Sequence, residues 1–242
     1  MFYFLLTPFL TYHVILIAAA VIPAIFLMIR VWRADRLESE SPELLFRLVI
    51  AGVISALIAL VSERILSFIL DSTVEQTTLL YQALLYFVVV AVSEEGAKYF
   101  MLKRRTWRNP EFNCQYDGVV YAVFVSLGFA LWENISYVLH YGFQTALVRA
   151  VTAIPGHACF GVFMGVFYGA AKRLDNEGKT GASRLCRRVG LLMSMLLHGA
   201  YDFIASMESD SGSWYFVGFV AVLFLVSFIL VGRTAKKDKY IA

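Results

Sequence analysis

The sequence predicts an all-α membrane protein, a bundle of about seven transmembrane helices that forms one domain over residues 1–242. Of the 242 residues, 60% are hydrophobic and only 16% are charged, and the mean hydropathy is +0.69. A soluble domain cannot cover its surface with so few polar side chains. The apolar residues also gather in runs that are long enough for a bilayer, which needs roughly 20 residues per helix.

Seven such runs follow one another, separated by charged segments and by segments that contain glycine or proline. They are Pro8–Val31, Leu44–Leu70, Leu79–Leu102, Tyr116–Leu139, Leu147–Ala171, Val189–Met207 and Trp214–Val231. The first run follows a start without basic residues and is long, which favours a retained helix over a cleaved signal peptide. Pro155 and Gly156 predict a kink near the start of the fifth run.

The basic residues are distributed unevenly between the connecting segments. Those after the first, third, fifth and seventh runs hold nearly all the lysine and arginine, and the others hold essentially none. Cytoplasmic loops of membrane proteins carry such an excess, so the N-terminus is predicted outside and the C-terminus in the cytoplasm. No basic patch with interleaved aromatic residues indicates a nucleic-acid partner. The three cysteines lack metal-site spacing, and no disulfide is expected.

The third run carries two adjacent carboxylates, Glu94 and Glu95. A charged residue near the bilayer centre costs about 2.5–3.5 kcal/mol on insertion scales, so such residues indicate a functional site. Lys98 follows three and four positions later, on the same helix face, and can serve both carboxylates. A purely structural ion pair between helices is the alternative interpretation.

Three further runs carry polar groups. Glu133 and Asn134 lie in the fourth, His157 in the fifth, and His198 and Asp202 in the sixth. Small residues that let helices approach closely recur every four positions beside them: Gly118, Ala122, Ser126 and Ala130 in the fourth run, and Gly161, Gly165 and Gly169 in the fifth. Because Asp202 is four residues from His198, it can fix the tautomer of that histidine. Structural hydrogen bonds are the alternative for each group.

This set of side chains offers carboxylates and imidazoles, with no serine or cysteine in a nucleophile-like setting. It suits general-base activation of water, with imidazole or amide donors for an oxyanion. Glutamate and histidine also bind zinc, so Glu94, His157 and His198 form an alternative metal site, although no HExxH motif is present. A proton-coupled transporter or channel uses similar groups, but the paired repeats of transporters are not visible. A non-catalytic membrane scaffold that keeps these polar groups for packing is a further alternative.

Four motifs, in this order, resemble those of the PrsW intramembrane proteases, which belong to a superfamily with the type II CAAX prenyl endopeptidases and the CPBP proteins. The motifs are Glu94-Glu95-x-x-Lys98, Phe129-x-x-x-Glu133-Asn134, His157-x-x-x-Gly161 and His198-x-x-x-Asp202. They lie within a motif-bearing core of about residues 79–207.

The resemblance implies a multi-pass endopeptidase of the bacterial cytoplasmic membrane. Its expected partner is a membrane-anchored protein, an anti-sigma factor in which it makes the first cut during a stress response. No cofactor is expected, with zinc as the alternative. The superfamily's mechanism makes Glu94 or Glu95 the general base, with Lys98 in support.

The resemblance also implies roles for the remaining motif residues. Glu133 or His157 helps to bind the water, Asn134 belongs to the same motif as Glu133, and His198 stabilises the oxyanion or shares the base role. Asp202 stands where the prenyl endopeptidases have asparagine, so it either orients His198 or is protonated.

One geometric conflict follows from the predicted runs. With straight helices rising 1.5 Å per residue, Glu94 and His198 would differ in depth from Glu133 and His157 by about 13 Å. Either a helix is shifted or tilted, or the four motifs do not meet at one point.

Overall fold

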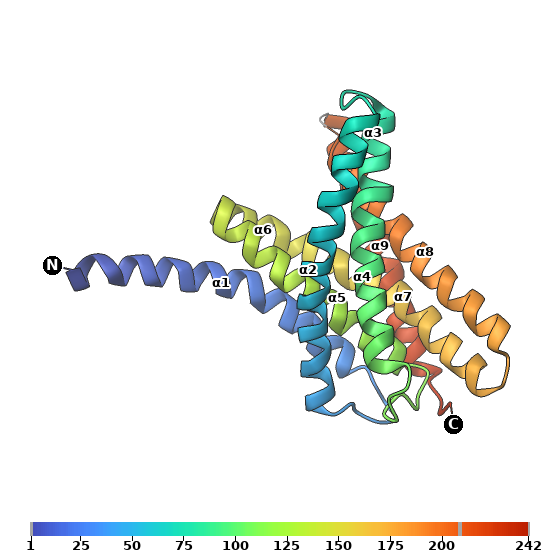
Figure 1. Cartoon of the computed structure of the whole chain (residues 1–242). Coiled ribbons are helices and arrows are strands. Elements are labelled where there is room, and N and C mark those ends of the chain that lie inside the picture. The colour runs from blue at the N-terminus through green and yellow to red at the C-terminus, as the bar shows by residue number, and fades with distance from the viewer. Residues whose placement is uncertain (1, 208–209, 242) are drawn as a thin grey trace.

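The computed structural model describes residues 2–207 and 210–241, and the regular elements among them are all helices (Figure 1). In chain order they are α1 (Phe2–Trp32), α2 (Pro42–Thr73), α3 (Leu79–Leu84), the π-helix η1 (Leu85–Val90), α4 (Ala91–Thr106), α5 (Asp117–Tyr141), α6 (Phe143–Val151), α7 (Ala153–Asn176), α8 (Thr180–Ala205) and α9 (Asp210–Lys236). The predicted all-α fold class is confirmed.

Six of the predicted spans are long and apolar enough to cross a membrane within the described part of the chain. They are Val14–Trp32, Pro42–Thr73, Leu79–Thr106, Asp117–Tyr141, Phe143–Asn176 and Gly212–Lys236. The remaining long helix, α8, carries Arg184, Arg187 and Arg188 in its first half. It is 26 residues long but is not among the six apolar spans.

The third span is continuous but not uniformly α-helical. Thr78 caps its start, with its hydroxyl accepting a hydrogen bond from the amide of Tyr81 at 3.1 Å. The π-helical turn η1 then follows α3 and leads into α4. Because a π-helix contains more residues per turn, it rotates the faces of α3 and α4 relative to each other. The sequence prediction of a single regular helix over Leu79–Leu102 missed this turn.

The fifth predicted span, Leu147–Ala171, was wrong as one helix, because the structure divides it into α6 and α7. The break lies at Thr152, ahead of the predicted kink. Pro155 is the third residue of α7, a position in the first turn where a missing N–H is tolerated. Its ring would clash with the carbonyl of Val151 in a continuous helix, so the chain breaks between Val151 and Ala153.

The predicted polar connection Lys172–Arg188 was also wrong in its extent. Helix α7 continues to Asn176 and α8 begins at Thr180. The turn between them is short because Gly178 adopts a positive φ of 77°, which glycine tolerates and other residues rarely do. The arginines of this region therefore lie on α8.

Helix α5 is the centre of the bundle and packs against α7, α2 and α1. The two predicted rows of small residues face each other. A Cβ atom added at Gly165 would lie 2.6 Å from the carbonyl oxygen of Gly118, and one added at Gly161 would lie 3.1 Å from the carbonyl oxygen of Ala122. The prediction that these rows allow close helix approach is confirmed.

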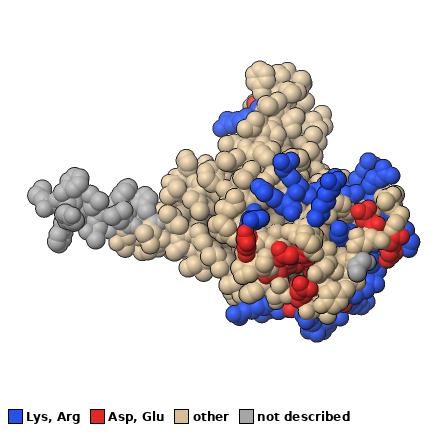
Figure 2. Space-filling model, turned by 60° about the horizontal axis from the view of Figure 1, so that its bottom comes forward, with Lys and Arg blue, Asp and Glu red and all other residues tan. Residues whose placement is uncertain are grey.

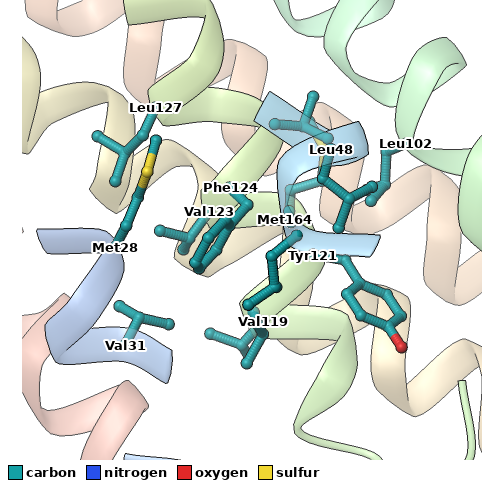
Figure 3. Close-up of a cluster of buried hydrophobic side chains, with 14 of the residues drawn as sticks. Met28, Val31, Leu48, Leu102, Val119, Tyr121, Val123, Phe124, Leu127 and Met164 are labelled. Atoms are coloured by element: carbon teal, nitrogen blue, oxygen red, sulfur yellow. The ribbon is translucent and has the colours of Figure 1, made fainter. Parts of the chain in front are cut away.

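A hydrophobic core surrounds the half of α5 that follows the segment 107–116 (Figure 3). It joins side chains of α1, α2, α4, α5, α7 and α9, among them Met28, Val31, Leu48, Leu102, Val119, Tyr121, Val123, Phe124, Leu127 and Met164. On the same end of the bundle, Lys and Arg side chains surround a smaller group of Asp and Glu (Figure 2). The basic segments predicted from the sequence therefore gather on one face.

Candidate active site

The side chains of the four motifs meet at one buried centre formed by α4, α5, α7 and α8. Its middle is Lys98, whose ammonium donates to Glu94 Oε2 at 3.0 Å and to Glu95 Oε1 at 2.8 Å. The same Nζ atom lies 3.2 Å from His157 Nδ1 and 3.8 Å from the centre of the Phe129 ring. Lys98 therefore contacts both carboxylates, as the spacing along the helix predicted.

Glu95 lies at the base of the centre, fully buried, with a partner at each oxygen. Besides Lys98, its Oε1 atom faces Nδ1 of His198 at 3.0 Å, and its Oε2 atom accepts a hydrogen bond from the hydroxyl of Ser194. Ser194 and His198 are neighbours on one face of α8, four residues apart. Every oxygen of this carboxylate is thus used within the protein.

His198 is held between acidic groups on both sides of its ring. Its Nε2 atom lies 3.2 Å from Asp202 Oδ2 and 3.8 Å from Glu94 Oε2, opposite the contact of Nδ1 with Glu95. Phe160 stacks on the ring at 4.7 Å between centroids. Only an imidazolium donates from both nitrogens, so this environment suits the protonated ring.

His157 has the opposite character. The ammonium of Lys98 is only a donor, so the nearby Nδ1 atom of His157 must accept. The proton of the neutral ring then lies on Nε2, which donates to Glu133 Oε2 at 2.8 Å. The two histidines are close neighbours, with ring centroids 5.3 Å apart.

Glu133 and Asp202 form the accessible side of the centre. Their side chains are 23% and 25% exposed, against 0% for Glu95 and 1% for Lys98. Both lie toward the ends of their helices that are distant from the connections 107–116 and 177–179, which precede α5 and α8. The centre is therefore closed toward the core and open toward the opposite end.

Asn134 is not directed into this centre. Its amide nitrogen donates to the carbonyl oxygen of Ala20 at 3.1 Å, and its Oδ1 atom accepts from Nε of Arg149 at 2.9 Å. It links α5 to α1 and α6. Arg149 itself was not among the residues predicted from the sequence, although a single arginine within the apolar run Leu147–Ala171 is a signal of function.

The expected difference in depth between the motifs does not occur. The prediction assumed one straight fifth helix from Leu147, but the structure has two helices, α6 and α7, that meet at Thr152. His157 therefore lies in the second turn of α7, where it reaches both Lys98 and Glu133.

A multi-pass helical bundle with buried carboxylates and imidazoles around an accessible rim defines a membrane-embedded protein with the groups of a hydrolase. Residues 40–231 match the model of a family described as "PrsW family intramembrane metalloprotease". The chain thus belongs to the PrsW family and is a protease, as the four motifs indicated.

Curated relatives agree with this assignment. The chain is 32% identical over 189 residues to Protease PrsW of Oceanobacillus iheyensis, covering 78% of this chain and 82% of the relative. It is 30% identical over 224 residues to Protease PrsW of Bacillus subtilis, covering 93% and 95%. No solved structure matched the chain.

Proposed function

We propose that the protein is an endopeptidase in which the Glu94 carboxylate activates water without a metal ion. The observation that carries the proposal is the contrast between the two neighbouring glutamates. Glu95 is fully buried and its oxygens are occupied by Lys98, His198 and Ser194. Glu94 is 9% exposed and, within the described residues, only its Oε2 atom has a recorded partner.

The Oε1 atom of Glu94 is therefore the position for a nucleophilic water. Glu94 takes a proton from that water, and the hydroxide oxygen forms a bond to the scissile carbonyl carbon. The C–N bond then breaks, and Glu94 returns the proton to the leaving amine. His198 contributes a positively charged donor 3.8 Å from Glu94, and such a group stabilises the oxyanion of the tetrahedral intermediate.

The family description raises the question of a metal ion. Donor atoms of Glu94, Glu95, His157 and His198 all lie within 4.8 Å of one another, and zinc binds such groups. The Nζ atom of Lys98, however, lies between three of these donors. As placed, the residues do not fit an ion, because Lys98 would have to leave first, so no step is assigned to a metal.

The expected substrate is a single-pass membrane protein, and by the family resemblance an anti-sigma factor. The orientation of the bundle supports a cut on the extracytoplasmic side of a bacterial cell membrane. The basic segments gather on one face (Figure 2), and such segments favour the cytoplasm. The exposed side chains of Glu133 and Asp202 lie toward the opposite ends of α5 and α8.

The test uses the purified chain in detergent with a candidate single-pass substrate. We expect wild type and Glu43→Gln, an exposed control on α2, to cleave the substrate, and Glu94→Gln and His198→Ala to lose cleavage while staying folded. Activity should survive a strong chelator, with metal analysis of the same sample. Unchanged cleavage in both site variants would contradict the proposal, and loss on chelation with return on adding zinc would replace it with the zinc alternative.

A further inference from the structure

We propose that Arg149 is a positioning residue of this site. Through Glu133 it holds His157 in the tautomer that accepts from Lys98, and it makes the active site depend on the placement of α6. The inference rests on the proposed function for its kinetic consequence, but its geometric part is independent of that function.

The first observation is where Arg149 comes from. Helix α6 carries none of the four motifs, yet its arginine reaches three side chains on α5. Arg149 Nη2 lies 3.0 Å from Glu133 Oε2, Nε donates to Asn134 Oδ1 at 2.9 Å, and the guanidinium carbon lies 4.0 Å from the centre of the Tyr137 ring. With a side chain only 15% exposed, it is fixed by these contacts rather than free in solvent.

The second observation is that Arg149 and His157 contact the same carboxylate oxygen. Glu133 Oε2 forms an ion pair with Arg149 Nη2 at 3.0 Å and accepts a hydrogen bond from His157 Nε2 at 2.8 Å. The planar guanidinium fixes the carboxylate in a way that a flexible ammonium does not. Because Glu133 is 23% exposed, without Arg149 it can turn to water and release His157.

The third observation is what His157 does at its other nitrogen. Its Nδ1 atom must stay unprotonated to face Lys98 Nζ at 3.2 Å. The order of contacts is thus Arg149, Glu133, His157 and Lys98, and the last of these pairs with Glu94. Loss of the contact between Arg149 and Glu133 therefore disturbs the Lys98 ammonium, which lies beside the proposed base Glu94.

The placement of α6 is itself controlled. Gly142 precedes this helix as its N-cap with a φ of 81°, in the left-handed region that favours glycine, and Thr152 follows it as the C-cap. Ala146 of α6 is fully buried in a small cluster with Leu16 and Ala20 of α1. Arg149 is therefore delivered to Glu133 by a short helix docked on α1, and a shift of α6 would move the guanidinium away.

The kinetic test compares Arg149→Ala and Arg149→Lys with Arg188→Ala, an exposed arginine on α8. We expect Arg149→Ala to lower kcat by about 10-fold to 100-fold with KM within about twofold, a size seen when groups that orient a site are removed. Arg149→Lys should recover part of kcat. In a Glu133→Gln background, Arg149→Ala should cost little more, because both act through one carboxylate.

The spectroscopic test is nitrogen NMR of ¹⁵N-histidine in a protein carrying His13→Gln and His140→Gln, which leaves two imidazoles. We expect His157 to be protonated at Nε2 alone, and Arg149→Ala and Arg149→Lys to show a mixture of tautomers. This reading needs no substrate, so it stands even where Glu94→Gln disproves the proposed mechanism.

Three results would overturn the inference: an unchanged His157 spectrum in Arg149→Ala, an effect confined to KM, or full additivity with Glu133→Gln. Where Arg149→Ala does not fold, Arg149→Lys supplies the same three readings.

Discussion

The ammonium nitrogen of Lys98 lies 3.2 Å from Nδ1 of His157, across the interface between α4 and α7. This contact joins the acidic pair Glu94 and Glu95 to the group formed by His157 and Glu133. A single buried cation thus joins the two groups, and it lies 59 positions from His157 in the sequence.

Replacement of Lys98 should lower the stability of the fold, and the loss of cleavage should follow from that. Lys98→Met leaves two buried carboxylates without a charged partner on α4, and breaking a buried ion pair from one side costs about 3–5 kcal/mol. We expect a large fall in the thermal unfolding midpoint in detergent, together with loss of cleavage. Lys103→Met, at an exposed position of the same helix, is the control, and equal midpoints for the two variants would show that Lys98 is not a stabilising centre.

Substitution of Asp202 separates its two predicted roles. Asp202→Asn keeps the shape beside His198 Nε2, which lies 3.2 Å away, but removes the negative charge that favours an imidazolium. Because Asp202 orients His198 in this account, kcat should fall by about 10-fold to 100-fold with the unfolding midpoint preserved. Near wild-type steady-state kinetics would contradict a role of Asp202 in orienting His198.

The facing rows of small residues predict that the same Gly→Ala substitution changes stability in opposite directions at Gly218 and at Gly165. An exposed helical Gly→Ala change stabilises by about 0.8–1.0 kcal/mol through helix propensity, and a Cβ at Gly218 meets no atom within 4 Å. A Cβ at Gly165 would lie 2.6 Å from backbone atoms of α5, and overpacking costs about 1–3 kcal/mol. Denaturation in detergent should therefore rank Gly218→Ala at or above wild type and Gly165→Ala below it, and the reverse order would contradict the packing described.

The segment between α1 and α2 predicts a pH dependence of stability. Burial, with added repulsion from Asp117, raises the pKa of Glu40 to about 9 from its usual 4.5. Between these two values the unfolded chain has lost a proton that the folded chain keeps, so this group lowers stability as pH rises from about 4.5 to about 9. The Glu40→Gln variant has no titratable carboxyl group at this position and therefore no such contribution.

The unfolding midpoint of Glu40→Gln should therefore fall less steeply than that of wild type over this range, and the variant should be the more stable protein at pH 8. Glu43→Gln, with an exposed carboxylate, should follow wild type. Parallel curves for Glu40→Gln and wild type would show that Glu40 does not keep its proton on folding.

Much of the bundle could be predicted from the sequence because its signals are local. Apolar length locates the helices, the four-residue spacing of Gly161, Gly165 and Gly169 predicts a packing face, and Glu94 to Lys98 spacing predicts an ion pair on one helix. These depend only on neighbours along the chain.

Other features depend on contacts between distant segments and could not be predicted in this way. The π-helical turn of Leu85–Val90 has no simple residue code, and the helix breaks at Thr152, ahead of the position at which Pro155 predicted a kink. Arg149 and Asn134 acquire their positions from α6 and α1. Asn134 was grouped with Glu133 because the two belong to one motif, but adjacent residues of a helix do not share a face, and only Glu133 enters the centre.

The most direct test of the central claim is the single-turnover cleavage rate of Glu94→Gln beside that of Glu95→Gln, with the unfolding midpoint of each protein. We expect Glu94→Gln to lose cleavage with only a small fall in the midpoint, because Lys98 keeps its contact with Glu95. Glu95→Gln should lose more stability, because Glu95 holds Lys98, His198 and Ser194 in place. A folded Glu94→Gln protein that cleaves at the wild-type rate would contradict the assignment of Glu94 as the base.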